Sequence, residues 1–163
     1  MAVTPLDRLI DPLRCMGKWY VQAAIPTPFD RHAHNGVEEY TWDPASERVA
    51  VTYTYRSKAL DGKETTIYQT GRISPKSTNR TVWQVAPWLG LFYLPVWLDY
   101  VILDVPHDYS HLVCSSPKTT GRGAWMYIMT REKLVSDEAL APLKAIAEKA
   151  GWDMSACVRV PQQ

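Results

Sequence analysis

Apolar and polar side chains alternate along many short stretches of this chain, a period that predicts β-strands. From residue 49 to residue 56 one face carries Val49, Val51, Tyr53 and Tyr55, and the other carries small or polar side chains. Comparable stretches, bounded by turn residues, occupy residues 17–25, 36–42, 64–73, 81–85, 100–105, 111–115 and 124–130. Eight consecutive antiparallel strands with short loops are typical of an up-and-down barrel or of a β-sandwich, and alternation alone does not decide between them.

One segment near the C-terminus has the period of an α-helix. Ser136 is placed to cap its start, Gly151 to end it, and between them runs an apolar stripe of Leu140, Leu143, Ile146, Ala147 and Ala150. Because Pro142 lacks a backbone N–H, we expect the helix to begin near this residue or to bend there. A ninth short strand is expected at residues 157–160.

Composition narrows the classes of function. The formal net charge is only +1 and no basic patch stands out, which argues against a nucleic-acid partner. Seven Trp and nine Tyr accompany two Phe. Trp and Tyr combine an apolar body with a polar tip, so they suit the wall of a pocket, although they are also ordinary strand residues.

The N-terminal residues and the cysteines bear on location. Residues 1–14 carry four charged side chains and no unbroken apolar run, so we expect no signal peptide, a cytoplasmic location and reduced thiols. The three cysteines are Cys15, Cys114 and Cys157, and their odd number leaves at least one unpaired. A disulfide bridge between Cys15 and Cys157 remains an alternative if the chain ends meet. We expect a monomer or a weak dimer.

Two short motifs resemble those of the lipocalin family. Gly17-Lys18-Trp19-Tyr20, at the start of the first expected strand, resembles the family's Gly-x-Trp-Tyr signature, and Arg131 follows the last expected barrel strand as the family's partner arginine does. The resemblance implies that the Arg131 guanidinium lies over the Trp19 indole at the closed end of a barrel. Such a contact contributes about 0.5–2 kcal/mol.

The likeness extends over most of the chain. Residues 99–105 and 108–113 resemble the family's sixth and seventh strands, although Pro106 stands where the family usually has Asp. Around residues 16–29 and 134–152 the chain is most similar to the branch of bacterial lipocalins, plant temperature-induced lipocalins and apolipoprotein D. The resemblance implies one all-β domain over residues 1–163: an eight-stranded antiparallel up-and-down barrel at about 17–131, an outer helix at about 136–150 and a short final strand at about 157–160.

If the barrel is hollow, its inward side chains surround a ligand. Taking the parity of Trp19 in the first strand and the more apolar face elsewhere, we expect the ligand-binding residues to be Tyr40, Val51, Tyr53, Ile67, Gln69, Trp83, Val85, Tyr100, Ile102, Leu112, Cys114, Trp125 and Tyr127. The same parity turns Glu38 inward, near water at the mouth. We expect a fatty acid, lysolipid or similar lipophile to bind there, with no cofactor. A solid core is the alternative, but it would leave buried tyrosine hydroxyls hard to satisfy.

The segment of residues 86–98 is rich in apolar side chains and joins the fifth and sixth expected strands. It contains Trp88, Leu89, Leu91, Phe92, Tyr93, Leu94 and Trp97. Exposed apolar patches mark interaction sites, and Trp and Tyr favour the bilayer interface, so we expect peripheral membrane contact here. A lid over the pocket or a dimer interface remains open.

Catalytic motifs are weak in this chain, and we expect a binding protein rather than an enzyme. His32 and His34 lie on a loop and are too few for a metal site, so no metal is expected. One alternative is an isomerase or synthase that uses the Cys114 thiol, with His107 or His111 nearby. A further alternative is a protein-interaction module with a solid barrel.

Overall fold

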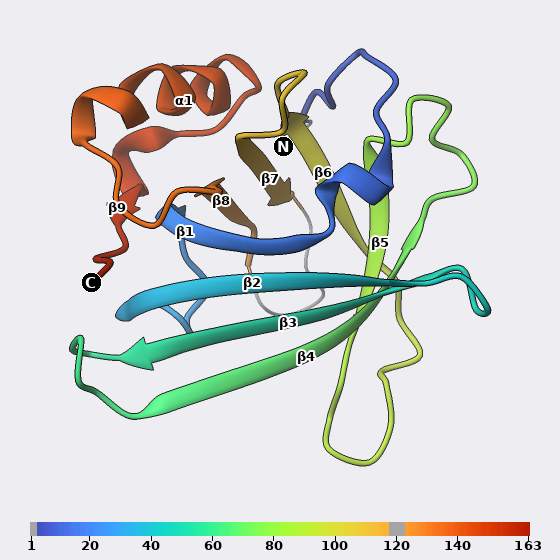
Figure 1. Ribbon diagram of the computed structural model, residues 1–163, viewed down its shortest axis with the longest axis horizontal. Helices are drawn as coiled ribbons and strands as arrows, with labels where there is room; N and C mark the ends of the chain where they lie inside the picture. The colour runs from blue at the N-terminus through green and yellow to red at the C-terminus, as the bar shows by residue number, and fades with distance from the viewer. Residues whose placement is uncertain (1–2, 118–122) are drawn as a thin grey trace.

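The computed structural model describes residues 3–117 and 123–163 and contains nine β-strands and one α-helix among them (Figure 1). The strands are β1 (Gly17–Ile25), β2 (Ala33–Asp43), β3 (Arg48–Ser57), β4 (Glu64–Ile73), β5 (Val82–Pro87), β6 (Leu98–Asp104), β7 (His111–Ser116), β8 (Trp125–Thr130) and β9 (Val158–Arg159). The helix is α1 (Asp137–Lys149), and two 3₁₀ turns are η1 (Pro12–Cys15) and η2 (Met154–Ala156).

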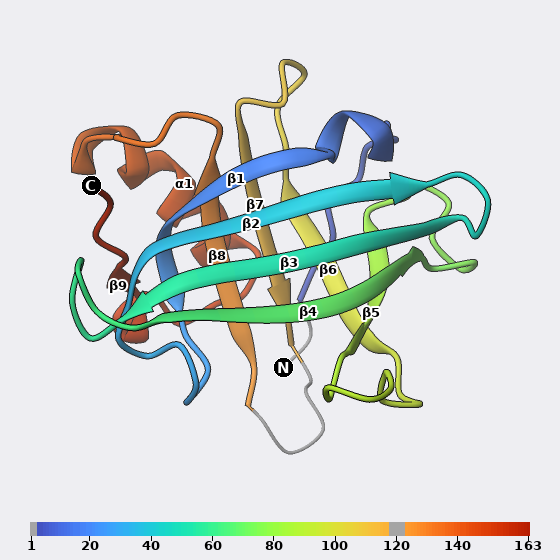
Figure 2. The ribbon, with the colours of Figure 1, turned by 60° about the horizontal axis from the view of Figure 1, so that its bottom comes forward.

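The sheet closes into a barrel because β1 pairs on both of its edges. It pairs with β2 near Gly17 and with β8 from Tyr20 onward, while β2 to β8 follow one another around the wall (Figure 2). All these pairs are antiparallel. The predicted eight-stranded antiparallel barrel is confirmed, and the sandwich alternative is wrong.

Alternation sends one set of side chains into the lumen and the other outward. In β3 the aromatic and aliphatic side chains from Val49 to Tyr55 are buried inside, as the sequence predicts. The register of β1 shifts between Val21 and Ala23, so Ala24 joins the lumen while Ala23 packs under the helix. A bulge of this kind inverts the parity of the residues that follow it. The expectation that β1 keeps the parity of Trp19 throughout is therefore wrong.

The helix α1 covers part of the outside of the barrel. The Ser136 side chain accepts a hydrogen bond from the Ala139 N–H, which caps the helix as predicted. Its buried side chains, Leu140, Leu143 and Ala147, pack with residues of β6, β7 and β8. The helix begins five residues before Pro142 and includes it, so the expectation of a start near this proline is wrong.

One end of the barrel is sealed by Trp19 and Arg131. The Trp19 side chain is fully buried, and the Arg131 guanidinium lies 3.6 Å from the centroid of its ring. The same guanidinium donates hydrogen bonds to the carbonyls of Arg14, Met16 and Lys18 at 2.8–2.9 Å. Gly17 has a φ of +90°, and a Cβ atom there would lie 3.4 Å from Arg131. This seal ties the segment before β1 to the end of β8.

Candidate functional site

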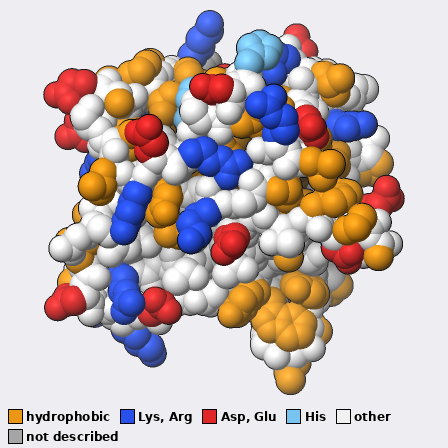
Figure 3. Space-filling model, viewed as in Figure 1, with side chains coloured by type: hydrophobic (Ala, Val, Ile, Leu, Met, Phe, Trp, Pro, Cys, Tyr) orange, Lys and Arg blue, Asp and Glu red, His pale blue; other side chains and the backbone are white. Residues whose placement is uncertain are grey.

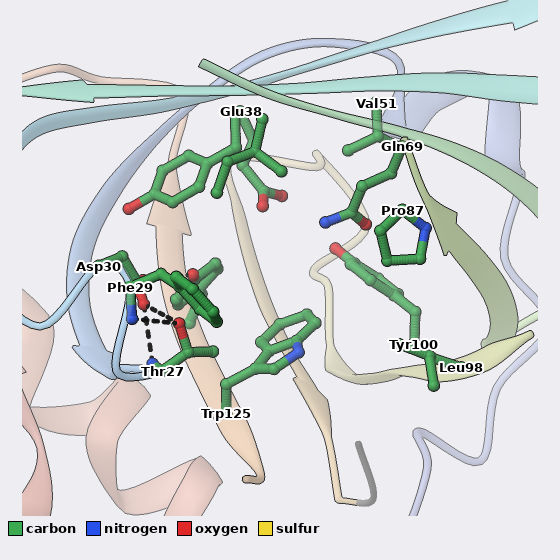
Figure 4. Close-up of a pocket in the computed structure, with 13 residues that line it drawn as sticks. Thr27, Phe29, Asp30, Glu38, Val51, Gln69, Pro87, Leu98, Tyr100 and Trp125 are labelled. Atoms are coloured by element: carbon green, nitrogen blue, oxygen red, sulfur yellow. Dashed lines mark hydrogen bonds between the residues drawn. The ribbon is translucent and has the colours of Figure 1, made fainter. Parts of the chain in front are cut away.

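A cavity of about 80 Å³ lies toward the opposite end of the barrel (Figure 4). Its walls come from the β1–β2 loop, from the inward faces of β2, β3, β4 and β8, and from the adjoining ends of β5 and β6. The lining residues are Thr27, Phe29, Asp30, Glu38, Val51, Tyr53, Ile67, Gln69, Pro87, Leu98, Tyr100, Trp125 and Tyr127. Most of these side chains are apolar or aromatic, which is the common composition of a small-molecule site.

The volume limits what fits without rearrangement. One water needs about 10–15 Å³ of such space, so the cavity has room for roughly five to eight waters, or for an organic molecule of roughly ten non-hydrogen atoms. A long acyl chain exceeds this. The half-exposed Phe29 is the lining residue that reaches furthest into solvent.

The predicted ligand-binding residues fall into two groups. Seven of them line the cavity: Val51, Tyr53, Ile67, Gln69, Tyr100, Trp125 and Tyr127. The other six lie outside it, in the packed part of the lumen: Tyr40, Trp83, Val85, Ile102, Leu112 and Cys114. There the ring of Trp83 stacks on Tyr100 at 5.5 Å and meets Tyr40 edge to face at 6.1 Å. The barrel is therefore filled toward its closed end and hollow toward its open end.

Alternation along the strands does not predict five of the lining residues: Thr27, Phe29, Asp30, Pro87 and Leu98. Thr27, Phe29 and Asp30 belong to a loop, where no period exists to place a side chain. Pro87 and Leu98 lie at strand ends that the sequence assigns to the connection between strands. The only sequence feature that indicates an ordered loop here is Phe29 followed directly by Asp30, after two prolines.

Asp30 brings a buried carboxylate to the rim of the cavity. Its side chain accepts hydrogen bonds from the backbone N–H and the hydroxyl of Thr27, at 2.8 and 2.5 Å, and from the Tyr127 hydroxyl. The residue is 4% exposed. These bonds fix the β1–β2 loop against β8 and leave an acidic group beside the cavity.

Glu38, on β2, is a second buried carboxyl group in the cavity wall, also 4% exposed. It accepts a hydrogen bond from the Tyr40 hydroxyl, which lies 2.7 Å from the Tyr100 hydroxyl. Burial raises the pKa of Glu38 to about 7; the Tyr40 hydrogen bond lowers the pKa in part, and the negative charge of Asp30 raises it by a smaller amount. The predicted inward orientation is confirmed, but the side chain is buried rather than in water.

These two carboxyls explain how a tyrosine-rich lumen satisfies its hydroxyls. Tyr40 and Tyr127 donate to Glu38 and Asp30, and burial holds their pKa values well above 10, so both stay neutral. The Tyr53 hydroxyl is different. It is buried and has no hydrogen-bond partner among the described residues. A buried polar atom without a partner calls for an explanation such as an unseen ligand or water.

The thiol of Cys114 lacks the surroundings of a nucleophile. It is fully buried outside the cavity, and burial raises its pKa well above 9. His111, which could have served as a base, instead lies with Nε2 2.6 Å from Asp104 Oδ2. Since the thiolate is the reactive form, the structure gives no support to the alternative of Cys114 chemistry.

The structure also shows where the cysteines and the two loop histidines lie. All three cysteines are free, so the bridge between Cys15 and Cys157 does not form. His34 Nδ1 lies 3.1 Å from the His32 carbonyl, and residues 3–117 and 123–163 hold no cluster of three or more His, Cys, Asp or Glu suited to a metal. In the same ranges, no helix has the length and apolar character needed to cross a bilayer.

The loop of residues 88–97 projects from the molecule beside the cavity. Its exposed apolar side chains are Leu89, Leu91, Phe92, Tyr93 and Val96, of which Leu91 is 87% exposed. Figure 3 shows a group of hydrophobic side chains at the lower right, where Figure 1 draws this loop. None of residues 88–97 lines the cavity, so the loop does not form the lid that the sequence left open.

Three residues expected in the exposed patch are half-buried instead. Trp88 packs against Tyr93 with ring centroids 4.9 Å apart, and Leu94 N–H bonds to the Pro87 carbonyl. Trp97 lies under two guanidinium groups, those of Arg48 at 4.8 Å and Arg72 at 4.1 Å from its centroid. Tryptophan therefore anchors the loop, and leucine and phenylalanine form its exposed surface.

Comparison with solved structures identifies similar folds. Insecticyanin from the tobacco hornworm Manduca sexta is 15% identical, with a TM-score of 0.77 over 99% of this chain and 85% of its own. Lobster apocrustacyanin A1 is 16% identical, with a TM-score of 0.68 over 99% and 92%. The siderocalin Ex-FABP, described as having dual ligand specificities, is 16% identical, with a TM-score of 0.63 over 92% and 95%.

Comparison at the level of sequence gives one match. A search of curated proteins finds none similar enough to report. The family model of the lipocalin-like domain matches residues 10–162, which is nearly the whole chain. With the closed barrel, the outer helix and the sealed end already described, this match is decisive: the chain belongs to the lipocalin family.

Proposed function

We propose that this lipocalin binds one small, mostly apolar molecule in the cavity at the open end of its barrel, and that it acts as a binding protein rather than as an enzyme. The observation that carries the proposal is the cavity itself, a hollow walled by Val51, Ile67, Leu98 and aromatic rings inside an otherwise packed lumen. Removing apolar ligand surface from water supplies the driving force, about 0.8 kcal/mol per buried methylene.

The size of the cavity bears on the ligand. The fatty acid or lysolipid expected from the sequence stays a prediction, because an acyl chain of about 14 carbons needs more than the roughly ten-atom space present. Such a ligand would require side chains at the rim, Phe29 above all, to move. A compact molecule with a single ring fits without that cost.

The test measures binding of a neutral probe of this size, 2-phenylethanol, by isothermal titration calorimetry. We expect saturable 1:1 binding to the intact chain. Ile67→Trp fills the cavity and lowers the affinity at least tenfold. Tyr68→Trp serves as the matched control, because Tyr68 is the next residue of β4 and lies exposed on the outer face. It leaves the affinity unchanged.

The outcome that contradicts the proposal is that neither 2-phenylethanol nor a charged analogue of the same size binds saturably, or that the bound probe has equal affinity for the wild type and for Ile67→Trp. Circular dichroism and thermal unfolding of each variant show whether the barrel is intact. Ile67 is only half-buried at the cavity wall, so we expect the larger side chain to be accommodated.

We also infer that the 88–97 loop contacts a membrane surface and lets ligand pass between bilayer and cavity. Two observations support this. Leu91 and Phe92 offer apolar surface to the solvent, and the loop is flanked by the cavity-lining residues Pro87 and Leu98. Side chains of this kind partition into the bilayer interface.

Flotation with phosphatidylcholine vesicles tests the membrane contact. We expect the wild type to float with the vesicles and Leu91→Ser combined with Phe92→Ser to lose at least four fifths of that binding. Leu9→Ser combined with Leu134→Ser, two exposed leucines elsewhere, is the matched control and should float normally. A wild type that never floats contradicts the inference. A dimer that the loop variant alone dissociates in sedimentation would make the patch an interface between copies instead.

A further inference from the structure

Two buried carboxyl groups face one apolar cavity without a cation. Asp30 and Glu38 both line it, while its other lining residues include no Lys, Arg or His. The ion pairs of the described residues join other groups: Arg56 with Glu64, His111 with Asp104, and Arg159 with Asp137. Buried charges are normally paired, because leaving water costs several kcal/mol per ion.

The fold gives the two carboxyls different support. Asp30 has three hydrogen-bond donors that hold the β1–β2 loop, a sufficient structural reason for its presence. Glu38 has one donor, the Tyr40 hydroxyl. A glutamine would accept that bond equally well, so neither packing nor hydrogen bonding within the barrel requires an acid at this position. Figure 4 shows the Glu38 carboxyl directed into the open space, with Asp30 and Trp125 across from it.

A second observation is independent of the carboxyls. The rings of Tyr53, Tyr127 and Trp125 form a chain, with centroid separations of 5.6 and 4.8 Å. Aromatic faces attract cations within about 6 Å.

We propose that the molecule bound in this cavity carries a protonated amine, which Glu38 and Asp30 neutralise and which the neighbouring aromatic rings help to hold. The inference rests on the proposed function and names its ligand class: a compact, apolar primary amine of roughly ten non-hydrogen atoms. A ligand carboxylate placed there would be a third negative charge in one buried site, so an anion is disfavoured.

Three probes of nearly equal shape separate the charge from the apolar body. We would measure binding of 2-phenylethylamine, 2-phenylethanol and 3-phenylpropionate to the full chain by calorimetry at pH 7.5. The amine should bind at least tenfold more tightly than the alcohol, and the carboxylate more weakly than either.

The decisive variant is Glu38→Gln, which keeps the shape and the acceptor for Tyr40. It should lower the affinity for the amine at least tenfold and change that for the alcohol by less than twofold. Glu39→Gln is the matched control: the same charge is removed from the next residue of β2, which is exposed on the outer face. It should change neither affinity.

The pH dependence of the affinity for the amine gives a further test. The groups that interact with Glu38 are Asp30, Tyr40, Tyr53, Tyr100, Cys114 and Tyr127. Burial keeps the four tyrosines and the thiol neutral, whereas it brings the pKa of Glu38 into the neutral range. With its pKa at about 7, the affinity for the amine should rise about tenfold from pH 6 to pH 8 in the wild type and stay flat in Glu38→Gln.

The outcomes separate the two proposals. If the alcohol binds as tightly as the amine, or if Glu38→Gln weakens both equally, the amine inference is overturned while the cavity remains a binding site. If none of the three probes binds, both proposals fail. Selective, pH-dependent loss of amine binding in Glu38→Gln supports the inference.

Discussion

Glu38 is a carboxyl group that the barrel buries without a cation, and this has a consequence for stability as well as for binding. Burial raises its pKa from 4.5 to about 7. Between these two values the folded state holds a proton that the unfolded chain has released. The stabilisation is therefore complete below pH 4.5 and is lost as the pH rises through about 7.

The size of this effect follows from the shift. A rise from 4.5 to about 7 corresponds to about 3 kcal/mol, so we expect Glu38→Gln to be more stable than the wild type at pH 8 by about 2–3 kcal/mol. At pH 4.5 the two proteins should differ by less than 1 kcal/mol. Urea unfolding at both pH values measures this, with Glu39→Gln as the control. Parallel pH profiles for wild type and Glu38→Gln would show that Glu38 titrates normally.

Single residues of the site were predictable only where a period exists. Alternation in β3 directs Val51 into the hollow, and the sequence shows that alternation plainly. In β8 the side chains from Trp125 to Met129 are all apolar, so the pattern there is weaker. The sequence shows nothing of the kind for Asp30, whose position depends on the path of a loop. The position of the carboxylate that accepts the hydrogen bond from Tyr127 therefore could not be predicted from the sequence pattern.

At the scale of the element, the join between β1 and β8 is the point on which closure depends. Arg131 reaches back from the end of β8 to three carbonyls before and at the start of β1, and covers the Trp19 ring. Hydrogen bonds from charged donors are stronger than neutral ones, and the planar guanidinium can make several at once.

We expect Arg131→Ala to lower the free energy of unfolding by about 2–4 kcal/mol, because three charged hydrogen bonds and a cation–π contact are lost together. Arg131→Lys keeps the charge but not the planar set of N–H donors, and it should recover less than half of the lost free energy of unfolding. Chemical denaturation gives both values. Arg14→Ala is a useful comparison, since it removes a nearby arginine that lies over Tyr109 instead. If Arg131→Ala cost no more than Arg14→Ala, the seal would have no special role.

The strands themselves were largely predictable, and their ends less so. All eight barrel strands lie where alternation predicts them, but β2 begins at Ala33, three residues early. The register of β2 and β3 is irregular between His34 and Val37, which breaks the alternation there. Similarly β5 runs on to Pro87 and β6 starts at Leu98, so the connecting loop is shorter than the apolar segment suggests.

At the scale of the whole molecule, the barrel is divided along its axis. Aromatic side chains such as Trp83 and Tyr40 fill the lumen toward the Trp19 seal, and the hollow lies above them toward the exposed 88–97 loop. Sequence patterns predict which side chains point inward, but not how much space they leave. That depends on rotamers and close packing among many side chains at once.

The central claim is that a small organic molecule occupies the hollow at the open end. A crystal structure of the protein grown with 2-phenylethylamine tests it most directly. The account predicts density for the ring beside Ile67 and Trp125, with the nitrogen within hydrogen-bond distance of Glu38. Density for the amine only on the outer surface, with the cavity filled by water or closed by its own side chains, would contradict it.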